Sequence, residues 1–282
     1  MSVESVAGNP PKVKGPLIYR QSRWTRLTHW SWAICLFFLM GSGLQIFNAH
    51  PTLYFGKQSG FEFQNAVLDI GLGAEGNEDI GVTTVFGHMF NTTGVLGLSG
   101  ASSLTQEDRA FPAWATIPSN RSLATGRIVH FFFAWTLLIT LFIWLVAGLI
   151  NGHVRRDLVP SVADIKNLPK DIADHARLRF HHTKEYNVLQ KFAYGSVLFV
   201  MLPLMILTGL TMSPNFTSFF PFLLDLFGGR QTARTIHFGV MLLLVGFFVV
   251  HMLMILAAGP INELRSIITG WYRIDAQSKK EM

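Results

Sequence analysis

The chain has 282 residues, of which 50% are hydrophobic and only 14% are charged. Together with a mean hydropathy of +0.35, this composition excludes an ordinary soluble domain of the same size and favours a membrane protein. The formal net charge of +6 follows the topology described below, so it gives no reason to expect nucleic acid as a partner.

Four apolar segments are long enough to cross a bilayer, which takes about 20 residues in an α-helix. They cover residues 28–47, 128–150, 192–212 and 236–258. The sequence before the first segment has no apolar stretch typical of a cleaved signal peptide, so we expect the first span to remain in the protein. A shorter apolar run, residues 216–227, contains Pro221 and Asp225 and predicts a helix lying in the membrane interface.

Basic residues indicate the orientation, because cytoplasmic flanks of membrane helices are enriched in Lys and Arg. The N-terminal tail, the connection between the second and third spans and the C-terminal tail hold 17 of the 23 Lys and Arg residues. These three segments lie on one side of a four-span chain, so we expect both termini to be cytoplasmic. The one cysteine, Cys35, lies in the first span and excludes a disulfide framework.

The long segment 48–125 lies on the opposite, extracytoplasmic side and contains seven carboxylates. Three stretches of it, HPTLYFG (50–56), GLGAEGNED (71–79) and FPAWATIP (111–118), predict turns and short irregular elements with exposed aromatic side chains. Loops of this length are often functional, so this one is either a variable loop or a docking surface for an extracytoplasmic partner. We predict a single membrane domain, residues 1–282, with residues 48–125 as a loop insertion.

The fourth span contains two histidines, His237 and His251, fourteen residues apart. In an α-helix this spacing separates them by about 21 Å along the axis and leaves them within about 40° of the same face. Ionisable side chains inside a membrane usually face the bundle interior and serve a function. Haem iron accepts histidine as an axial ligand, and a second ligand would come from another helix.

Two further histidines lie at matching depths. His29 opens the first span, and His130 opens the second, which runs in the opposite direction. Depth therefore pairs His29 with His251 near the cytoplasmic side and His130 with His237 near the outer side. We predict an all-α membrane protein, a four-helix bundle holding two b-type haems stacked across the membrane, each with two histidine ligands.

Three of these histidines follow an arginine by three residues, and the arginines are Arg26, Arg127 and Arg234. Residues three apart share a helix face, and a guanidinium suits the carboxylates of haem propionates. Each arginine alone could equally be an ordinary interfacial residue with its charge in the headgroup region. The threefold repetition of one spacing favours propionate binding.

Glycines give weaker support for a flat cofactor. Gly195 and Gly209 lie fourteen residues apart in the third span, and Gly43 lies fourteen residues beyond His29. A glycine lets a macrocycle approach the helix backbone, but glycine is also common where membrane helices pack. Both interpretations remain open.

The inner end of the second span contains Asn151, Gly152 and His153, a candidate quinone site. An imidazole can hydrogen-bond a quinone carbonyl and exchange its proton, since its unperturbed pKa lies near neutrality. His153 could instead compete with His29 as a haem ligand, or cap the helix end in water. The other histidines fall in loops and receive no ligand role: His50, His88, His175, His181 and His182.

These motifs resemble the di-haem cytochrome b subunits of nickel-iron hydrogenases, formate dehydrogenase N and thiosulfate reductase. The resemblance rests on RxxHW (26–30), RxxH (127–130) and the histidine pair of the fourth span, and the loop with HPTLYFG is most similar to the thiosulfate-reductase type. It implies a subunit that anchors a periplasmic oxidoreductase, often a molybdenum protein. It also implies electron transfer between that partner and the quinone pool, with the quinone near the cytoplasmic-side haem.

Two other functions compete with this electron-transfer role. A stand-alone four-helix cytochrome b could act directly on a small molecule such as superoxide with quinone as acceptor, although the long loop would cover the approach. A transporter or proton channel would need acidic partners for its histidines within the membrane, and the four spans contain none. No catalytic side chain is predicted, because the cofactor carries the chemistry.

Overall fold

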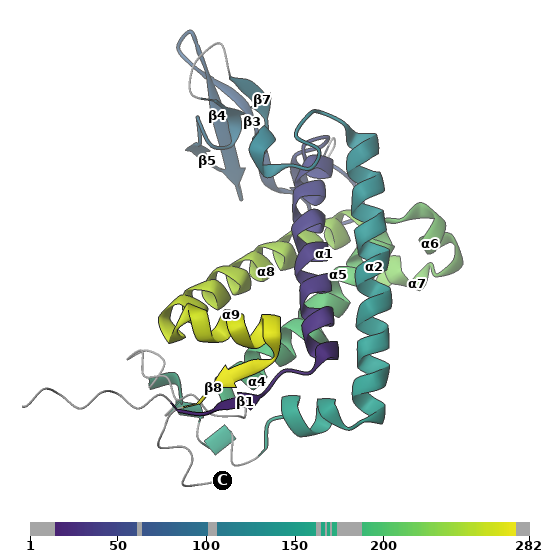
Figure 1. Ribbon diagram of the computed structural model, residues 1–282. Helices are drawn as coiled ribbons and strands as arrows, with labels where there is room; N and C mark the ends of the chain where they lie inside the picture. The colour runs from purple at the N-terminus through teal and green to yellow at the C-terminus, as the bar shows by residue number, and fades with distance from the viewer. Residues whose placement is uncertain are drawn as a thin grey trace, which may run out of the picture.

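The computed structural model describes residues 15–60, 64–100, 106–161, 165–166, 168–169, 171–173 and 188–274. Four helical segments are long and apolar enough to cross a membrane, as predicted (Figure 1). They are α1 (Arg23–Phe47), α2 (Leu123–Ile150), the segment Val188–Met212 and α8 (Arg230–Ala258). Each begins four to six residues before the predicted boundary.

Polar caps explain the early starts of α1 and α2. The hydroxyl of Ser22 accepts a hydrogen bond from the backbone N–H of Thr25 at 3.0 Å, and Ser122 accepts one from Thr125 at 3.4 Å. Each cap satisfies one of the free N–H groups in the first helical turn. Because the caps precede the apolar stretches, hydropathy alone places both helix starts too late.

The third span is irregular. It consists of α4 (Val188–Ser196), the π-helical segment η3 (Val197–Met201) and α5 (Leu202–Met212). Pro203 lacks an N–H and cannot bond to the carbonyl of Phe199, which loosens the helical ladder at this point. The span therefore changes its helical pitch near the middle of the bundle.

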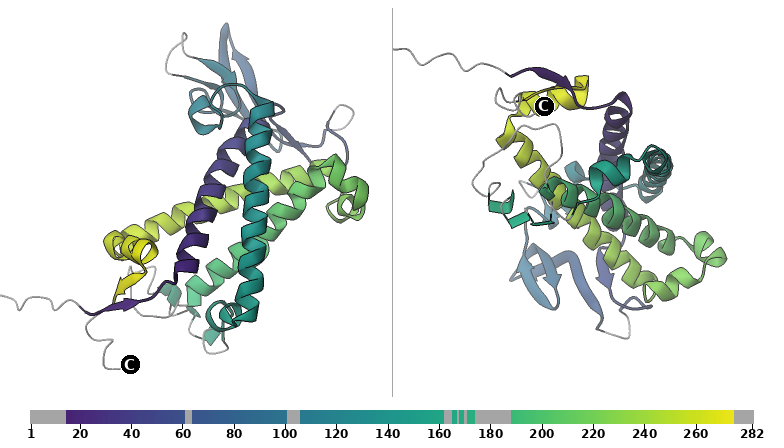
Figure 2. Two further views of the ribbon diagram at one scale, coloured as in Figure 1. Left: turned by 45° about the vertical axis from the view of Figure 1, so that its right-hand side comes forward. Right: turned by 90° about the horizontal axis from the view of Figure 1, so that it is seen from below.

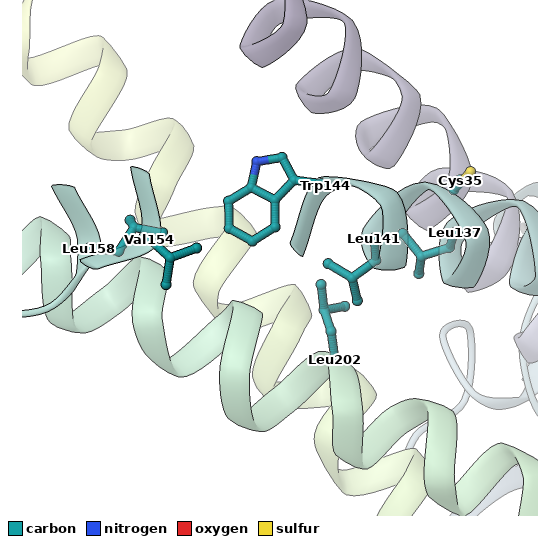
Figure 3. Close-up of a cluster of buried hydrophobic side chains, with 7 residues drawn as sticks. All are labelled: Cys35, Leu137, Leu141, Trp144, Val154, Leu158 and Leu202. Atoms are coloured by element: carbon teal, nitrogen blue, oxygen red, sulfur yellow. The ribbon is translucent and has the colours of Figure 1, made fainter. Parts of the chain in front are cut away.

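The spanning helices pack mainly in two pairs, α1 with α2 and α5 with α8 (Figure 2). Within the first pair Gly126 permits close contact, since a Cβ there would lie 3.0 Å from the side chain of Gln45. A cluster of buried apolar side chains joins the two pairs (Figure 3). It comprises Cys35, Leu137, Leu141, Trp144, Val154, Leu158 and Leu202.

The segment between α1 and α2 forms β-sheets, so the prediction of turns and irregular elements is wrong for residues 50–56 and 71–79. Residues 111–118 do form a short irregular element, with a 3-10 turn at Ala113–Ala115 and the exposed side chain of Trp114. An antiparallel sheet runs in the order β2 (Thr52–Tyr54), β3 (Ala66–Glu75), β4 (Glu78–Val85) and β5 (His88–Asn91). A second, two-stranded sheet pairs β6 (Gly97–Ser99) with β7 (Glu107–Arg109). The class all-α therefore describes the membrane bundle but not this insertion.

The longest hairpin of the insertion was not predicted, because its sequence is rich in glycine. Within GLGAEGNED, strands β3 and β4 pair up to Glu75 and Glu78, which leaves Gly76 and Asn77 as a two-residue turn. Gly76 has a φ of +66°, the region that short hairpin turns require. Gly76 therefore belongs to a tight turn between two paired strands.

Arg109 holds the insertion on the end of α1. Its side chain is only 3% exposed, and its guanidinium donates to Gln45 Oε1 at 2.8 Å, Thr116 Oγ1 at 2.9 Å and the Ser119 carbonyl at 2.8 Å. Glu107 forms an ion pair with it at 3.2 Å. A buried charge is stable only when it is paired and hydrogen-bonded, so this network fixes the insertion to the bundle.

Short elements complete the two ends of the bundle. The expected interfacial helix consists of two pieces, α6 (Pro214–Phe219) and α7 (Phe222–Leu226), with exposed phenylalanines. Beyond α8, helix α9 (Pro260–Thr269) leads to β8 (Trp271–Arg273), which pairs with β1 (Leu17–Tyr19). We call the end with β1, β8 and α9 the terminal end, and the end with the β-sheets of the insertion the insertion end (Figure 1).

Candidate functional site

A large cavity of about 1940 Å³ lies among the spanning helices. Typical ligand pockets measure roughly 300–1,000 Å³, so this cavity has room for more than one large cofactor. Most of the side chains around it are apolar, and they come from all four spans and from α9. The four predicted haem ligands, His29, His130, His237 and His251, all line it.

His130 of α2 and His237 of α8 lie opposite each other near the insertion end, with ring centroids 6.4 Å apart and ring planes inclined by 58°. Metal–imidazole bonds are about 2 Å long, so two imidazoles on opposite sides of one metal ion have centroids roughly 6 Å apart. The separation of these two rings therefore fits a single metal ion between them.

Each of these rings has a hydroxyl at its Nδ1 atom. The Oγ atom of Ser42 lies 3.1 Å from Nδ1 of His130, and Oγ1 of Thr208 lies 3.0 Å from Nδ1 of His237. The other ring nitrogen, Nε2, is thereby left as the atom that can bind a metal. Neither Ser42 nor Thr208 was predicted as a site residue, although each directly precedes a glycine that was predicted as one.

Two of the three predicted glycines lie beside these rings. A Cβ on Gly43 would be 3.4 Å from Cε1 of His130, and one on Gly209 would be 3.5 Å from Cε1 of His237. Both glycines line the cavity and present bare backbone to it. Gly195 has open space at its Cβ position and is not among the described residues that line the cavity.

His29 and His251 lie toward the terminal end and are close enough to interact electrostatically. His251 stacks on Phe247, with ring centroids 5.8 Å apart. Among the described residues Nδ1 of His29 is buried and has no hydrogen-bond partner. Because buried polar atoms are normally satisfied, this orphaned nitrogen fits a site for a bound group.

The three predicted arginines differ in position. Arg127 and Arg234 line the cavity, and the guanidinium of Arg127 lies 5.7 Å from the ring centroid of Phe131. Arg26 is outside the described lining of the cavity, and it donates a hydrogen bond to the carbonyl of Ile268 in α9 at 2.6 Å. Two of the three arginines that share this spacing therefore line the cavity, and the third, Arg26, attaches α1 to α9.

The sequence model of one protein family, described as prokaryotic cytochrome b561, matches residues 20–270. This chain belongs to the prokaryotic cytochrome b561 family. It is also 32% identical over 133 residues to the putative protein-methionine-sulfoxide reductase subunit YedZ1 of Azospira oryzae, which covers 45% of this chain. The aligned part spans 62% of that relative's length. No solved structure matches the chain.

Membership of the cytochrome b561 family confirms the prediction of a haem-binding cytochrome b that transfers electrons within a prokaryotic membrane. The described residues fit the b-type haem that this family binds. Three observations support this fit. They are the 6.4 Å separation between the ring centroids of His130 and His237, the backbone of Gly43 and Gly209 that faces the cavity, and the buried Nδ1 of His29, which has no hydrogen-bond partner among the described residues. The closer assignment to the thiosulfate-reductase type stays a prediction.

Of the three candidate quinone residues of this cytochrome b561 chain, one lines the cavity and two do not. His153 lines the cavity and meets Trp144 edge to face, with ring centroids 6.3 Å apart. Asn151 and Gly152 are not part of the described lining. Instead, Asn151 Oδ1 accepts the backbone N–H of His153 at 2.9 Å and Gly152 has a φ of +71°, so the two form the turn that directs His153 inward.

Sequence patterns missed other polar groups at that end of the cavity, namely Asp171, Gln190 and Tyr194. They lie outside or at the start of the third apolar segment, where hydropathy gives no signal. Of the histidines without a predicted role, His50 and His88 lie in the insertion. His175, His181 and His182 are outside the described residues.

Proposed function

We propose that this chain is a di-haem cytochrome b subunit that carries electrons across the membrane between the quinone pool and a periplasmic oxidoreductase, which it anchors. One observation carries the proposal: a single cavity contains a histidine pair near each end of the bundle, and α8 supplies one member of each pair. His130 and His237 would bind one haem, and His29 and His251 the other. Bound haem supplies a one-electron centre.

The chain's own residues provide the surroundings that such a cofactor needs. Most of the cavity wall is apolar, and an apolar shell limits the access of solvent to a redox centre and tunes its reduction potential. Arg127 and Arg234 offer cationic groups on the cavity wall for propionates. The two histidine pairs, one toward each end of the bundle, support transfer between opposite membrane faces.

The insertion supports the proposed anchoring of a partner. It is fixed to α8 close to His237, because Thr235 donates to the Tyr54 carbonyl at 2.6 Å and the N–H of Gly56 donates to Thr232 Oγ1 at 2.7 Å. Several of its large apolar side chains are exposed, a feature of interaction surfaces. They include Phe86, Met89, Phe90 and Trp114.

The named relative supports an oxidoreductase as the partner, because it is described as a putative reductase subunit. We propose that the partner here is likewise the catalytic subunit and that it is periplasmic, with a molybdenum enzyme as the specific expectation. The orientation proposed from basic residues places the insertion on that side, with both termini in the cytoplasm of a bacterial inner membrane.

The test is a haem count on the purified chain and on four histidine variants. We expect two haem b per chain by the pyridine haemochrome assay. His130→Ala and His237→Ala should lose one and the same haem, and His29→Ala and His251→Ala the other. One haem or none in the wild-type chain, or loss of the same haem from His29→Ala and His237→Ala, would overturn the proposal.

Capture of the partner is a separate test of the anchoring role. A tagged chain with its insertion intact should copurify with a periplasmic oxidoreductase subunit. A chain that holds two haems, copurifies with no such subunit and reacts directly with superoxide would instead be a stand-alone oxidoreductase. The haem assignment and the partner assignment can therefore fail independently.

A further inference from the structure

Two small hydroxyl residues contact the two insertion-end histidines in the same way. Ser42 and Thr208 have no exposed surface, and each directly precedes the glycine beside the ring that it contacts. Ser42–Gly43 on α1 and Thr208–Gly209 on α5 thus present a hydroxyl and bare backbone to His130 and His237. The repetition on two helices from different pairs argues against a chance contact.

The direction of both hydrogen bonds follows from counting protons. A hydroxyl has one proton, and Ser42 is placed to donate it to the carbonyl of Phe38 at 2.6 Å. Thr208 is placed in the same way against the carbonyl of Leu204 at 2.7 Å. With its own proton directed to a carbonyl, each hydroxyl oxygen accepts the Nδ1–H of its histidine. The backbone carbonyls of Leu39 and Met205 also hydrogen-bond these two rings, and a carbonyl can only accept, which agrees with a proton on Nδ1 and a lone pair on Nε2.

We propose that Ser42 and Thr208 are positioning residues for the insertion-end haem, which orient Nε2 of His130 and His237 toward iron and lower the reduction potential of that haem. An Nδ1–H that donates a hydrogen bond fixes the ring orientation and makes the imidazole a more basic ligand. A more basic ligand stabilises ferric over ferrous iron. The inference rests on the proposed binding of haem by His130 and His237.

The terminal-end pair lacks this arrangement of hydroxyl and glycine in the part of the chain that the structure describes. Nδ1 of His29 has no hydrogen-bond partner there, and the His251 ring stacks on Phe247 and interacts electrostatically with Glu263. The effect of the two hydroxyls should therefore be confined to one of the two haems. The other haem serves as an internal reference in each measurement.

The test is a potentiometric titration of Ser42→Ala and Thr208→Val. Both variants should keep two haems at saturating haem, and the potential of the insertion-end haem should rise while that of the other haem stays unchanged. The insertion-end haem is identified as the one missing from His130→Ala. Haem retention at that site should weaken by about 10-fold or more, the usual effect of losing a partner of a ligating histidine.

Thr211→Val is the matched control. Thr211 is also fully buried on α5, and its hydroxyl donates to the Leu207 carbonyl at 2.8 Å. This variant should leave both potentials unchanged, and Thr208→Ser should restore the wild-type potential because it keeps the hydroxyl. If Thr208→Val fails to fold, Ser42→Ala and Thr208→Ser still decide the question.

Two results would overturn the inference while leaving the proposed function intact. One is a Ser42→Ala protein with two haems and wild-type potentials. The other is a shift of equal size in Thr211→Val, which would assign the effect to packing. Failure of the proposed function looks different, since the wild-type chain would then hold fewer than two haems or His130→Ala would lose none.

Discussion

Arg234 donates a hydrogen bond to the backbone carbonyl of Thr52 at 3.1 Å, which joins the helix that carries His237 and His251 to the first strand of the insertion. The same guanidinium donates to the carbonyl of His50. An arginine predicted to bind propionate therefore also fixes the insertion on the bundle. The insertion and the insertion-end histidine pair should respond together when this contact is weakened.

The pH dependence of this contact has a definite sign. Burial and then the neighbouring Arg234 lower the pKa of His50 below its ordinary value of 6.5, against a smaller opposite effect of Asp69. The folded protein thus favours neutral His50, and the resulting stabilisation is present above about pH 6.5 and is lost as the pH falls through the lowered pKa. We expect the insertion to become more sensitive to protease as the pH falls below about 6.5.

Replacing His50 checks this prediction. His50→Gln should reduce the dependence of protease sensitivity on pH, because glutamine does not titrate. His88→Gln changes an exposed histidine on β5 and is the control. An unchanged pH profile in His50→Gln would show that other groups cause the acid response.

The Arg109 network predicts the largest effect on the stability of the insertion. Arg109→Met removes three hydrogen bonds to Gln45, Thr116 and Ser119 and leaves buried acceptors without a donor. We expect a loss of about 2–4 kcal/mol in the stability of the insertion, faster proteolysis there and weaker partner capture. Both haems should remain, since Arg109 is not among the described residues that line the cavity.

Arg121→Met is the matched control for that variant. Arg121 also forms an ion pair, with Asp108 at 3.3 Å, but both side chains are more than half exposed. Exposed pairs contribute about 1 kcal/mol or less, so its proteolysis rate should stay near that of the wild-type chain. Equal sensitivity of the two variants would refute the anchoring role of Arg109.

Sequence patterns predicted the membrane part of the fold well, because long apolar runs have few alternative structures. The predicted C-terminal boundaries of all four spans coincide with the helix ends at Phe47, Ile150, Met212 and Ala258. The insertion was missed because its longest strand, β3, is interrupted by glycines and because β2, β6 and β7 have only three residues each, so that these segments carry little hydrophobic alternation. The π-helical segment of the third span follows from Pro203, and hydropathy carries no signal for such a change in helical pitch.

The candidate site was predictable to the extent that it depends on helix periodicity. Depth and spacing alone selected four histidines that line one cavity. The hydroxyls of Ser42 and Thr208 were not selected, because serine and threonine are common in membrane helices and usually bond to their own backbone. The position of Arg26 against α9 could not be foreseen either, since it depends on a helix that folds back beyond the fourth span.

Larger side chains at the two cavity glycines should displace the insertion-end haem. Gly43→Val and Gly209→Val would place branched side chains beside the Cε1 atoms of His130 and His237, in space that opens into the cavity. We expect the haem content to fall from two toward one per chain, with the terminal-end haem retained. The pyridine haemochrome assay measures this directly.

Gly239→Val in α8 is the control for helix propensity. A Cβ at Gly239 meets nothing within 4 Å, and this residue is not among those described as lining the cavity. A β-branched residue in a helix has a modest intrinsic cost at any position, so Gly239→Val should keep both haems. Haem loss in this variant equal to that in Gly43→Val would contradict a role for cavity space.

We propose that the quinone binds at the terminal end of the cavity, beside His153. His153 reaches the cavity from the turn after α2 and lies edge to face with Trp144, so its ring nitrogens can hydrogen-bond a quinone carbonyl and exchange a proton with water. His153→Ala should therefore keep both haems but slow haem reduction by a quinol analogue by about 10²-fold, the lower end of typical general acid–base effects.

The outcome of that experiment also separates the other roles of His153. Loss of one haem from His153→Ala would make this residue a ligand in place of His29, and unchanged quinol kinetics would place the quinone elsewhere in the cavity. His88→Ala, at the other end of the molecule, should change neither haem content nor kinetics. Because dithionite reduces haem without quinone chemistry, equal dithionite rates in His153→Ala and the wild-type chain would locate the defect at the quinone step.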